Sequence, residues 1–248
     1  MTLNLCSGIV GAHTVTNRYK MRTKTLLLSA AAIAAGLVSS QAQSNVYSAN
    51  IVGYVTTVFK GGGAYTLVAN PLDSSSNSVI GLLDSILPNK SQVLTWDPVA
   101  QGYITAQKTG GTWSTNTPLP VGTGFFVKTP TAQATDITNT FVGNIIVAPN
   151  GGTNKVTLPL GYYLAGSAVP FNGSVNDYLN GVTNTINLGG VLPNKSQILT
   201  WDTTAQGYVT SQKTGGTWST NTPLNPGAGF FVKSQFGGTN WIETLSVQ

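Results

Sequence analysis

The stretch from Leu87 to Tyr103 reads LPNKSQVLTWDPVAQGY, and it returns from Leu192 to Tyr208 as LPNKSQILTWDTTAQGY. The match continues at the same spacing as far as the repeated segment GFFVK. Over 87–130 and 192–235, 34 of 44 positions are identical. An internal match of this length indicates one structural unit that is present twice.

The repeated stretch has the pattern of a β-hairpin. Residues 91–97 alternate in polarity and are rich in β-forming side chains, and residues 103–107 alternate again after a turn. Short strands separated by Gly- and Pro-containing turns predict an all-β fold, with two tandem β-sandwich or barrel-like modules and at most one or two short helices. The other elements that the pattern predicts are strands at 125–128 and 137–147 and a helix over 79–86.

Weaker matches outside the repeated block predict the module boundaries. Ile51-Val52-Gly53 resembles Phe141-Val142-Gly143, and the spacing between equivalent residues grows along the chain, which indicates insertions in loops of the second copy. These matches predict modules at 43–140 and 141–248. Since no Pro-rich or charged linker separates them, we expect the modules to be in contact, with the strand near 137–147 at the seam.

The N-terminal residues have the features of an export signal. Basic residues precede an apolar stretch from Leu26 to Val38, and Ser40-Gln41-Ala42 follows it. This order predicts a signal peptide within residues 1–42, with Met21 as the true start and cleavage after Ala42. The apolar stretch is shorter than the roughly 20 residues that span a bilayer. We therefore expect a mature chain without a membrane span that is secreted or displayed on the cell surface, with the periplasm as an alternative.

The composition of residues 43–248 narrows the range of functions. This part has eight lysines, no arginine and seven acidic residues, and it contains no cysteine, histidine or methionine. A nearly neutral chain lacks the basic surface that nucleic-acid binding requires. Without histidine or cysteine, the usual general bases, nucleophiles and zinc ligands are missing. The sequence therefore predicts a protein that is not an enzyme, holds no cofactor and does not bind nucleic acid.

The order of the aromatic and glycine residues resembles a known group of modules. Trp96-Asp97, Gly102-Tyr103 and Gly124–Val127 follow one another in an arrangement similar to the poorly characterised β-sandwich repeat modules of secreted and cell-surface proteins from environmental Gram-negative bacteria. The segment 49–55, ANIVGYV, is also typical of that group. The resemblance implies a β fold and export, and it implies no catalytic residues. The second copy departs from the pattern at Ser167-Ala168, where the first has Asn-Pro.

Aromatic side chains are the main candidates for ligand binding. Trp113 and Trp218 lie in Gly/Thr-rich stretches, which predicts that they are exposed, and Tyr103 and Tyr208 are expected to assist them. Such rings could stack on sugar rings. The alternative is that the aromatic residues form the cores of the modules, since each ring buries a large area.

Asp97 and Asp202 are weak candidates for metal binding. Each follows a tryptophan and opens a turn, so the simplest interpretation is an Asx-type hydrogen bond to the turn backbone. Calcium requires six to eight oxygen ligands, several of them charged. One carboxylate among neutral oxygens would bind calcium only weakly.

Two functions follow as hypotheses. The first is an exported, non-catalytic structural or adhesive β-repeat protein that presents a polar surface or self-associates through sheet edges. The second is a carbohydrate-binding protein with one aromatic platform per module and polysaccharide as its partner. An enzyme with an unrecognised carboxylate site is the weakest alternative.

Overall fold

The computed structural model describes residues 51–146, 154–170, 172–175 and 188–243. The predicted signal peptide, the start at Met21 and the cleavage after Ala42 lie outside these residues. The described residues belong to one compact unit, Ala49–Gln248. Within them, no helix combines the length and the apolar character needed to cross a membrane.

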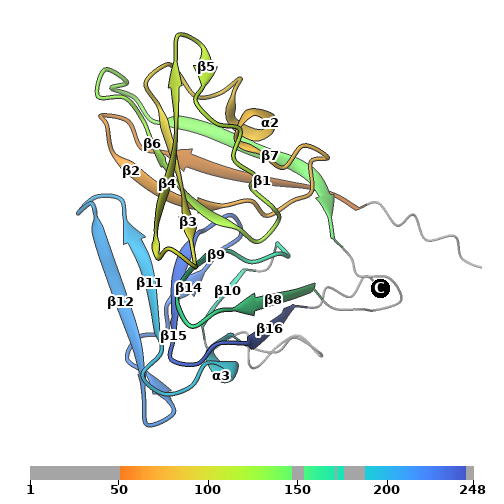
Figure 1. Ribbon diagram of the computed structural model, residues 1–248, viewed down its shortest axis with the longest axis vertical. Coiled ribbons are helices and arrows are strands. Elements are labelled where there is room, and N and C mark those ends of the chain that lie inside the picture. Colours follow the sequence, from red (N-terminus) through yellow and green to blue (C-terminus); the bar gives the residue numbers. More distant parts are fainter. Residues whose placement is uncertain (1–50, 147–153, 171, 176–187, 244–248) are drawn as a thin grey trace, which may run out of the picture. The chain divides into compact units, whose positions relative to one another are not determined.

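The first module is an antiparallel five-stranded sheet with a separate two-stranded sheet (Figure 1). The strand order of the larger sheet is β2-β6-β3-β4-β5, and β1 pairs with β7 in the smaller one. Its elements are β1 (Ile51–Phe59), β2 (Tyr65–Ala69), α2 (Val79–Leu83), β3 (Gln92–Asp97), β4 (Gly102–Thr109), β5 (Thr112–Trp113), β6 (Gly124–Lys128) and β7 (Ile137–Ile145).

The second module repeats this arrangement. Its five-stranded sheet has the order β9-β15-β11-β12-β13, β8 pairs with β16, and a short extra pair joins β10 and β14. Within the described residues, the predicted all-β fold with two sheet-based modules and at most two short helices is confirmed. The elements of this module are β8 (Asn154–Leu158), β9 (Gly161–Ala165), β10 (Gly173–Ser174), α3 (Leu188–Val191), β11 (Gln197–Asp202), β12 (Gly207–Thr214), β13 (Thr217–Trp218), β14 (Pro223–Leu224), β15 (Phe230–Ser234) and β16 (Thr239–Glu243).

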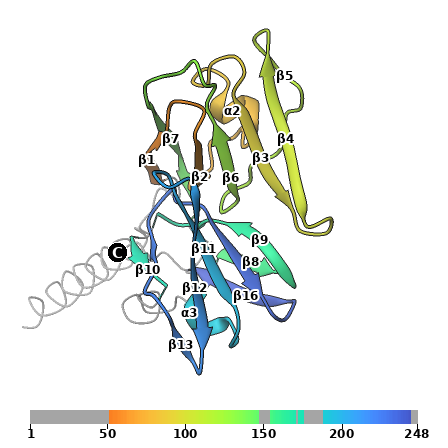
Figure 2. The ribbon, with the colours of Figure 1, turned by 90° about the vertical axis from the view of Figure 1, so that its left-hand side faces the viewer.

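The hairpin predicted from the repeated stretch is formed by β3 and β4, and by β11 and β12 in the second copy. Trp96 pairs with Tyr103 across the first hairpin, and Asp97 pairs with Gly102. Gln101 in the turn has a φ of 51°, in the left-handed region. Figure 2 shows that this turn lies close to β9 of the second module.

The predicted helix over 79–86 is shorter in the structure and spans Val79–Leu83. It begins after Ser78, whose hydroxyl accepts a hydrogen bond from the backbone N–H of Gly81 at 3.2 Å and so caps the first turn. Val79 and Leu83 are buried and pack into the core of the module with Phe59 of β1. The helix therefore fills the space between the larger sheet and the β1–β7 pair.

The predicted boundary after residue 140 falls inside β7 (Ile137–Ile145). This strand pairs with β1 over its whole length, from Ile51 opposite Ile145 to Phe59 opposite Ile137. The match between residues 51–53 and 141–143 thus relates two strands that pair with each other rather than equivalent strands of the two modules. By topology the equivalent of β1 is β8, which pairs with β16, so β7 closes the first module.

Candidate functional site

Each five-stranded sheet is buried on both faces at its centre. In β6, Phe125 and Val127 contribute to the core of their own module, whereas Phe126 between them packs against the other module. Burial of both faces of the sheet explains why β6 has apolar residues at three successive positions, Phe125, Phe126 and Val127. Together with Phe126, the third core contains Leu67, Leu164 and Phe231, with partly buried Tyr65, Leu94, Trp96, Tyr162, Leu199 and Trp201 around them.

The contacts across this third core occur twice, once in each direction. The indole N–H of Trp96 donates to the backbone carbonyl of Tyr162 at 2.9 Å, and that of Trp201 donates to the carbonyl of Tyr65 at 2.9 Å. Equivalent residues of the two copies thus exchange equivalent bonds. This is the pattern of a two-fold interface between identical subunits, here formed within one chain.

Two glutamines extend the same symmetry. The side-chain amide of Gln101 accepts a hydrogen bond from the backbone N–H of Tyr162 at 3.0 Å and donates to its carbonyl at 3.1 Å. Gln206 makes the same pair of bonds to Tyr65, at 2.7 Å and 3.1 Å. Each amide therefore satisfies the backbone of an edge strand, β9 or β2. Their role was not predicted, although the repeated Gln-Gly-Tyr turn was the available signal.

Replacing Gln101 or Gln206 with alanine is expected to destabilise the protein by about 1–2 kcal/mol in each case, because three hydrogen bonds to backbone groups are lost, two at the edge strand and one within the turn itself. Urea unfolding of both variants measures this, and equal losses are expected from the symmetry. Gln107→Ala is the matched control, since its amide makes only a 3.5 Å contact with Gln92. A loss for Gln107→Ala as large as the other two would contradict the assignment.

The backbones of the two modules approach closely where β2 and β9 end. The backbone N–H of Ala69 donates to the carbonyl of Gly227, and that of Gly166 donates to the carbonyl of Gly122, both at 2.9 Å. A Cβ atom at Gly166 would lie 2.0 Å from the Cβ of Ala69. Ala69 and Gly166 are equivalent residues, so they mark the pseudo-two-fold axis, and the chain accommodates only one methyl group there.

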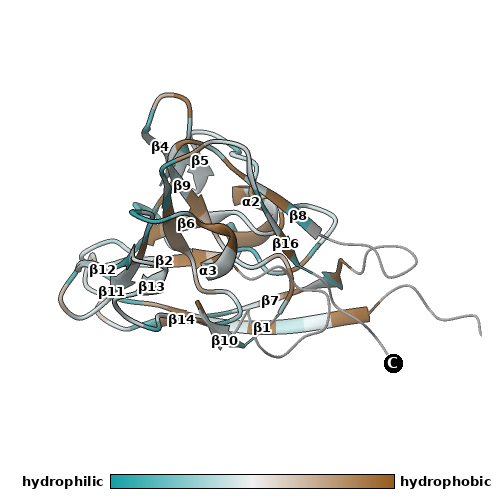
Figure 3. Cartoon of the chain, turned by 90° about the horizontal axis from the view of Figure 1, so that it is seen from below, coloured by the Kyte–Doolittle hydropathy of each residue, from teal (hydrophilic) through white to brown (hydrophobic). Residues whose placement is uncertain are grey.

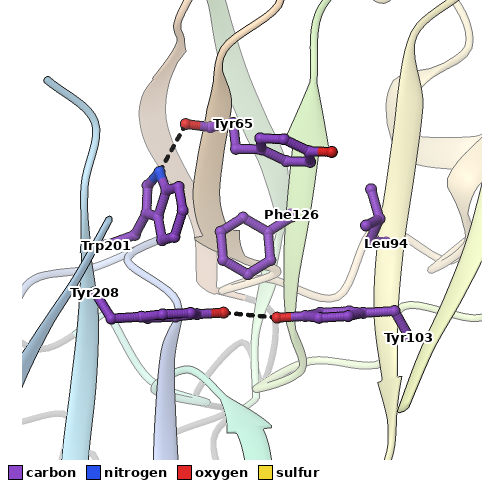
Figure 4. Close-up of a pocket in the computed structure, with 6 residues that line it drawn as sticks. All are labelled: Tyr65, Leu94, Tyr103, Phe126, Trp201 and Tyr208. Carbon is purple, nitrogen blue, oxygen red and sulfur yellow. Dashed lines mark hydrogen bonds between the residues drawn. The ribbon is translucent and has the colours of Figure 1, made fainter. Parts of the chain in front are cut away.

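At a second point on the axis, Tyr103 and Tyr208 meet hydroxyl to hydroxyl at 2.6 Å. Figure 4 shows both rings edge-on and in line. Each side chain remains 43% exposed, so the pair faces solvent in part. Partial burial raises the pKa of both phenols above the ordinary value, which keeps them protonated at neutral pH and unsuited to act as bases.

The tyrosine pair separates two equivalent cavities, which we call the Tyr65 box and the Tyr162 box. Their volumes are about 280 Å³ and 310 Å³. Both boxes use residues of both modules. The Tyr65 box is lined by Tyr65, Leu94, Tyr103, Phe126, Trp201 and Tyr208 (Figure 4). The Tyr162 box is lined by Trp96, Tyr103, Tyr162, Leu199, Tyr208 and Phe231.

Edge-to-face contacts hold the walls of the boxes. The ring centroids of Trp201 and Tyr208 are 4.9 Å apart at an interplanar angle of 80°, and those of Phe126 and Trp201 are 5.1 Å apart at 85°. Trp96 makes the equivalent contacts with Tyr103 and Phe231. Such pairs are favourable beyond their buried area, so the ring positions are set by the fold.

The prediction that Trp113 and Trp218 are exposed is wrong, since each is only 6% exposed. Trp113 pairs with Lys108 across the turn between β4 and β5, and this register places it on the side of the sheet that forms the module core. Its indole N–H donates to Asp84 at 2.9 Å. Both tryptophans belong to module cores, whereas Tyr103 and Tyr208 line the boxes, so the four predicted ligand-binding residues are not brought together.

The Asx interpretation of Asp97 and Asp202 is confirmed. The Oδ1 atom of Asp97 accepts hydrogen bonds from the backbone N–H groups of Val99 and Ala100 at 2.8 Å and 3.0 Å, and Asp202 repeats this arrangement. These backbone donors hold the pKa of both carboxyls below the ordinary value. Among the described residues, no group of three His, Cys, Asp or Glu side chains comes together as metal ligands would.

Glu243 is fully buried at the end of β16 and contacts the loop in which the second copy departs from the first. Its carboxyl accepts a hydrogen bond from the backbone N–H of Ala168 at 2.7 Å. The hydroxyl oxygen of Ser167 lies 2.5 Å from both Oε1 of Glu243 and the carbonyl oxygen of Val169. Burial raises the pKa of this carboxyl to about 7.

Comparison of the chain with protein-family models, with curated proteins and with solved structures finds no match. The function must therefore be argued from the contacts described above.

Proposed function

We propose that the protein is an exported, non-catalytic structural or adhesive β-repeat protein of the cell surface or extracellular matrix. The observation that carries this proposal is the outer face of the β1–β7 sheet, which presents exposed apolar, threonine and asparagine side chains. Its members are Val52, Tyr54, Thr56, Val58, Thr138, Thr140, Val142 and Asn144.

This face is suited to packing against a second copy of itself. Tyr54 is 71% exposed and lies opposite Val142, which is also exposed. Thr56 and Thr140 share a hydrogen bond at 3.1 Å in the centre of the face. Figure 3 shows apolar stretches of β1 that alternate with less hydrophobic ones. Neither β1 nor β7 contains a charged residue, so two such faces would meet without repulsion.

The absence of catalysis is supported by how the reactive groups are used. The tyrosine pair stays protonated at neutral pH, and Asp97 and Asp202 are occupied by turn backbone. Glu243 is buried beside neutral groups. The hydroxyl of Ser167 contacts this carboxyl, but both residues are buried and closed to a substrate, and the sequence supplies no histidine after residue 42.

Sedimentation velocity of the purified chain at increasing concentration tests self-association. We expect the wild type to form dimers or larger assemblies, and Tyr54→Ser combined with Val142→Thr to shift the protein toward monomer by at least ten-fold in dissociation constant. Val99→Thr removes an exposed apolar residue in a turn and is the matched control. A wild type that stays monomeric at all concentrations would contradict the proposed self-association. Recovery of the protein only from the cytoplasm would contradict the proposed export.

A second candidate function, carbohydrate binding, is favoured by the Tyr103–Tyr208 pair. The pair offers aromatic surface partly open to solvent, beside cavities walled by further rings. The arrangement differs from one platform per module, because each box combines residues of both modules. A glycan array probed with the intact chain tests this candidate, and the absence of signal on every glycan would eliminate it.

A further inference from the structure

We propose that each aromatic box binds a uronic acid ring of an anionic polysaccharide, with the sugar carboxylate beside Lys128 at the Tyr65 box and beside Lys233 at the Tyr162 box. This inference rests on the carbohydrate-binding candidate and names its ligand class. One chain would hold two such rings.

The lysines stand directly beside the box walls. Lys128 pairs with Tyr65 across β2 and β6, so both side chains lie on the sheet face that also carries Phe126. The ammonium nitrogen of Lys128 is 4.9 Å from the centroid of the Tyr65 ring. Lys233 stands 5.0 Å from the ring of Tyr162 in the same way. Each box therefore has one positive charge next to one of its walls.

These two charges are not neutralised within the described part of the chain. There, carboxylates pair only with Lys60 and Lys108. Lys213, on the core side of its sheet, donates instead to the backbone carbonyls of Gly189 and Leu192. Lys128 and Lys233 are thus left to attract an anion, and the lining of the boxes contains no acidic residue that would repel it.

Amide side chains next to the lysines suit the hydroxyl groups of a sugar. Gln92 pairs with Lys128 and with Gln107 in the strand register, so the three side chains share the face of the box. The two amides are held to each other only by a long contact of 3.5 Å, which leaves their other donors and acceptors open. Gln197, Gln212 and Lys233 repeat the set beside the other box.

The walls themselves select a ring by its apolar face. The indole N–H groups of Trp96 and Trp201 are bonded to carbonyls, and the hydroxyls of Tyr103 and Tyr208 are bonded to each other. The volume of each box lies near the lower end of the range for ligand sites, roughly 300–1,000 Å³, which is room for one ring rather than a long segment. A sugar ring would stack inside while its hydroxyls and carboxylate face the amides and the lysine.

Calorimetric titration of the intact chain with an oligogalacturonate tests the proposal, with tryptophan fluorescence as a second readout because Trp96 and Trp201 line the boxes. The comparison ligands are a neutral cello-oligosaccharide of the same length and sodium benzoate, a flat ring that bears a carboxylate but is not a sugar. We expect two uronate rings to be bound per chain, a fluorescence change, and affinity that falls with added salt.

Lys128→Gln combined with Lys233→Gln is expected to weaken oligogalacturonate binding at least ten-fold. Lys90→Gln combined with Lys195→Gln is the matched control, because these exposed lysines form an equivalent pair that does not line the boxes and their loss changes the net charge equally. The control is expected to bind like the wild type. An equal loss in both double variants would show that net charge alone is responsible and would overturn the site.

The remaining outcomes separate the inference from the candidate function it rests on. If the neutral oligosaccharide binds as tightly as the oligogalacturonate, the anionic ligand class is wrong, while carbohydrate binding stands. If benzoate binds and neither oligosaccharide does, the sugar assignment is wrong. If no ligand binds, both the inference and the carbohydrate-binding candidate are wrong.

Discussion

Gly166→Ala is expected to lower the free energy of unfolding by about 3 kcal/mol, an effect at the upper end for overpacking a filled site. The new Cβ would lie 2.0 Å from the Cβ of Ala69, and the backbones cannot separate freely because the N–H of Gly166 is bonded to Gly122 across the interface. Denaturant unfolding followed by tryptophan fluorescence measures the loss.

Two further variants identify the cause of this loss. Gly207→Ala adds the same methyl group where the nearest atom is 3.9 Å away, and it should cost less than about 1 kcal/mol. Ala69→Gly combined with Gly166→Ala moves the single methyl group across the pseudo-two-fold axis and should recover most of the lost stability. If the double variant is no more stable than Gly166→Ala alone, the two positions do not compete for one space and the axis is misplaced.

Stability is expected to fall by about 3 kcal/mol as the pH rises from 4.5 to above 7, because of Glu243. The pKa of this carboxyl is about 7 in the folded chain and 4.5 in its ordinary state. A raised pKa in the folded state means that the contribution is fully present below pH 4.5 and is lost as the pH rises through 7. Each unit of difference corresponds to about 1.36 kcal/mol.

The pH window is free of other expected transitions. Residues 43–248 contain no histidine, and Asp84, Asp97, Asp136 and Asp202 have lowered pKa values, so they reduce stability only at more acidic pH. Chemical denaturation across the pH range measures the slope. Glu243→Gln should remove it, because the amide stays neutral, whereas Asp97→Asn should retain it. A wild type with constant stability between pH 4.5 and 7 would show that Glu243 is ionised in the folded chain.

The interface between the modules explains why so much of the repeated block is identical. Trp96, Gln101 and Phe126 each contact the other copy, and their equivalents return the same contacts. A substitution in one copy alone would remove one of the two equivalent contacts between the modules. Where the symmetry is broken, as at Ser167-Ala168, the second copy has its own contact to Glu243.

Several features could be derived from the sequence because they depend on local patterns. The hairpin at 91–107 follows from alternation around a turn, and the Asx turn at Asp97 follows from a short polar side chain at a turn. The duplication was visible directly. Each of these depends on residues within about one turn or one hairpin of each other.

Only the tertiary structure shows which side chains of a sheet face the core of their own module and which face the other module. Trp113 and Tyr103 both lie near turns of the first module, yet the strand register places Trp113 in the module core, whereas Tyr103 faces the second module and meets Tyr208 at the two-fold axis. Which strand closes the first module, and that Glu243 meets Ser167, likewise depend on pairing over long sequence distances. Local alternation shows that a strand has two sides, but the partner on each side is set by the packing of whole sheets.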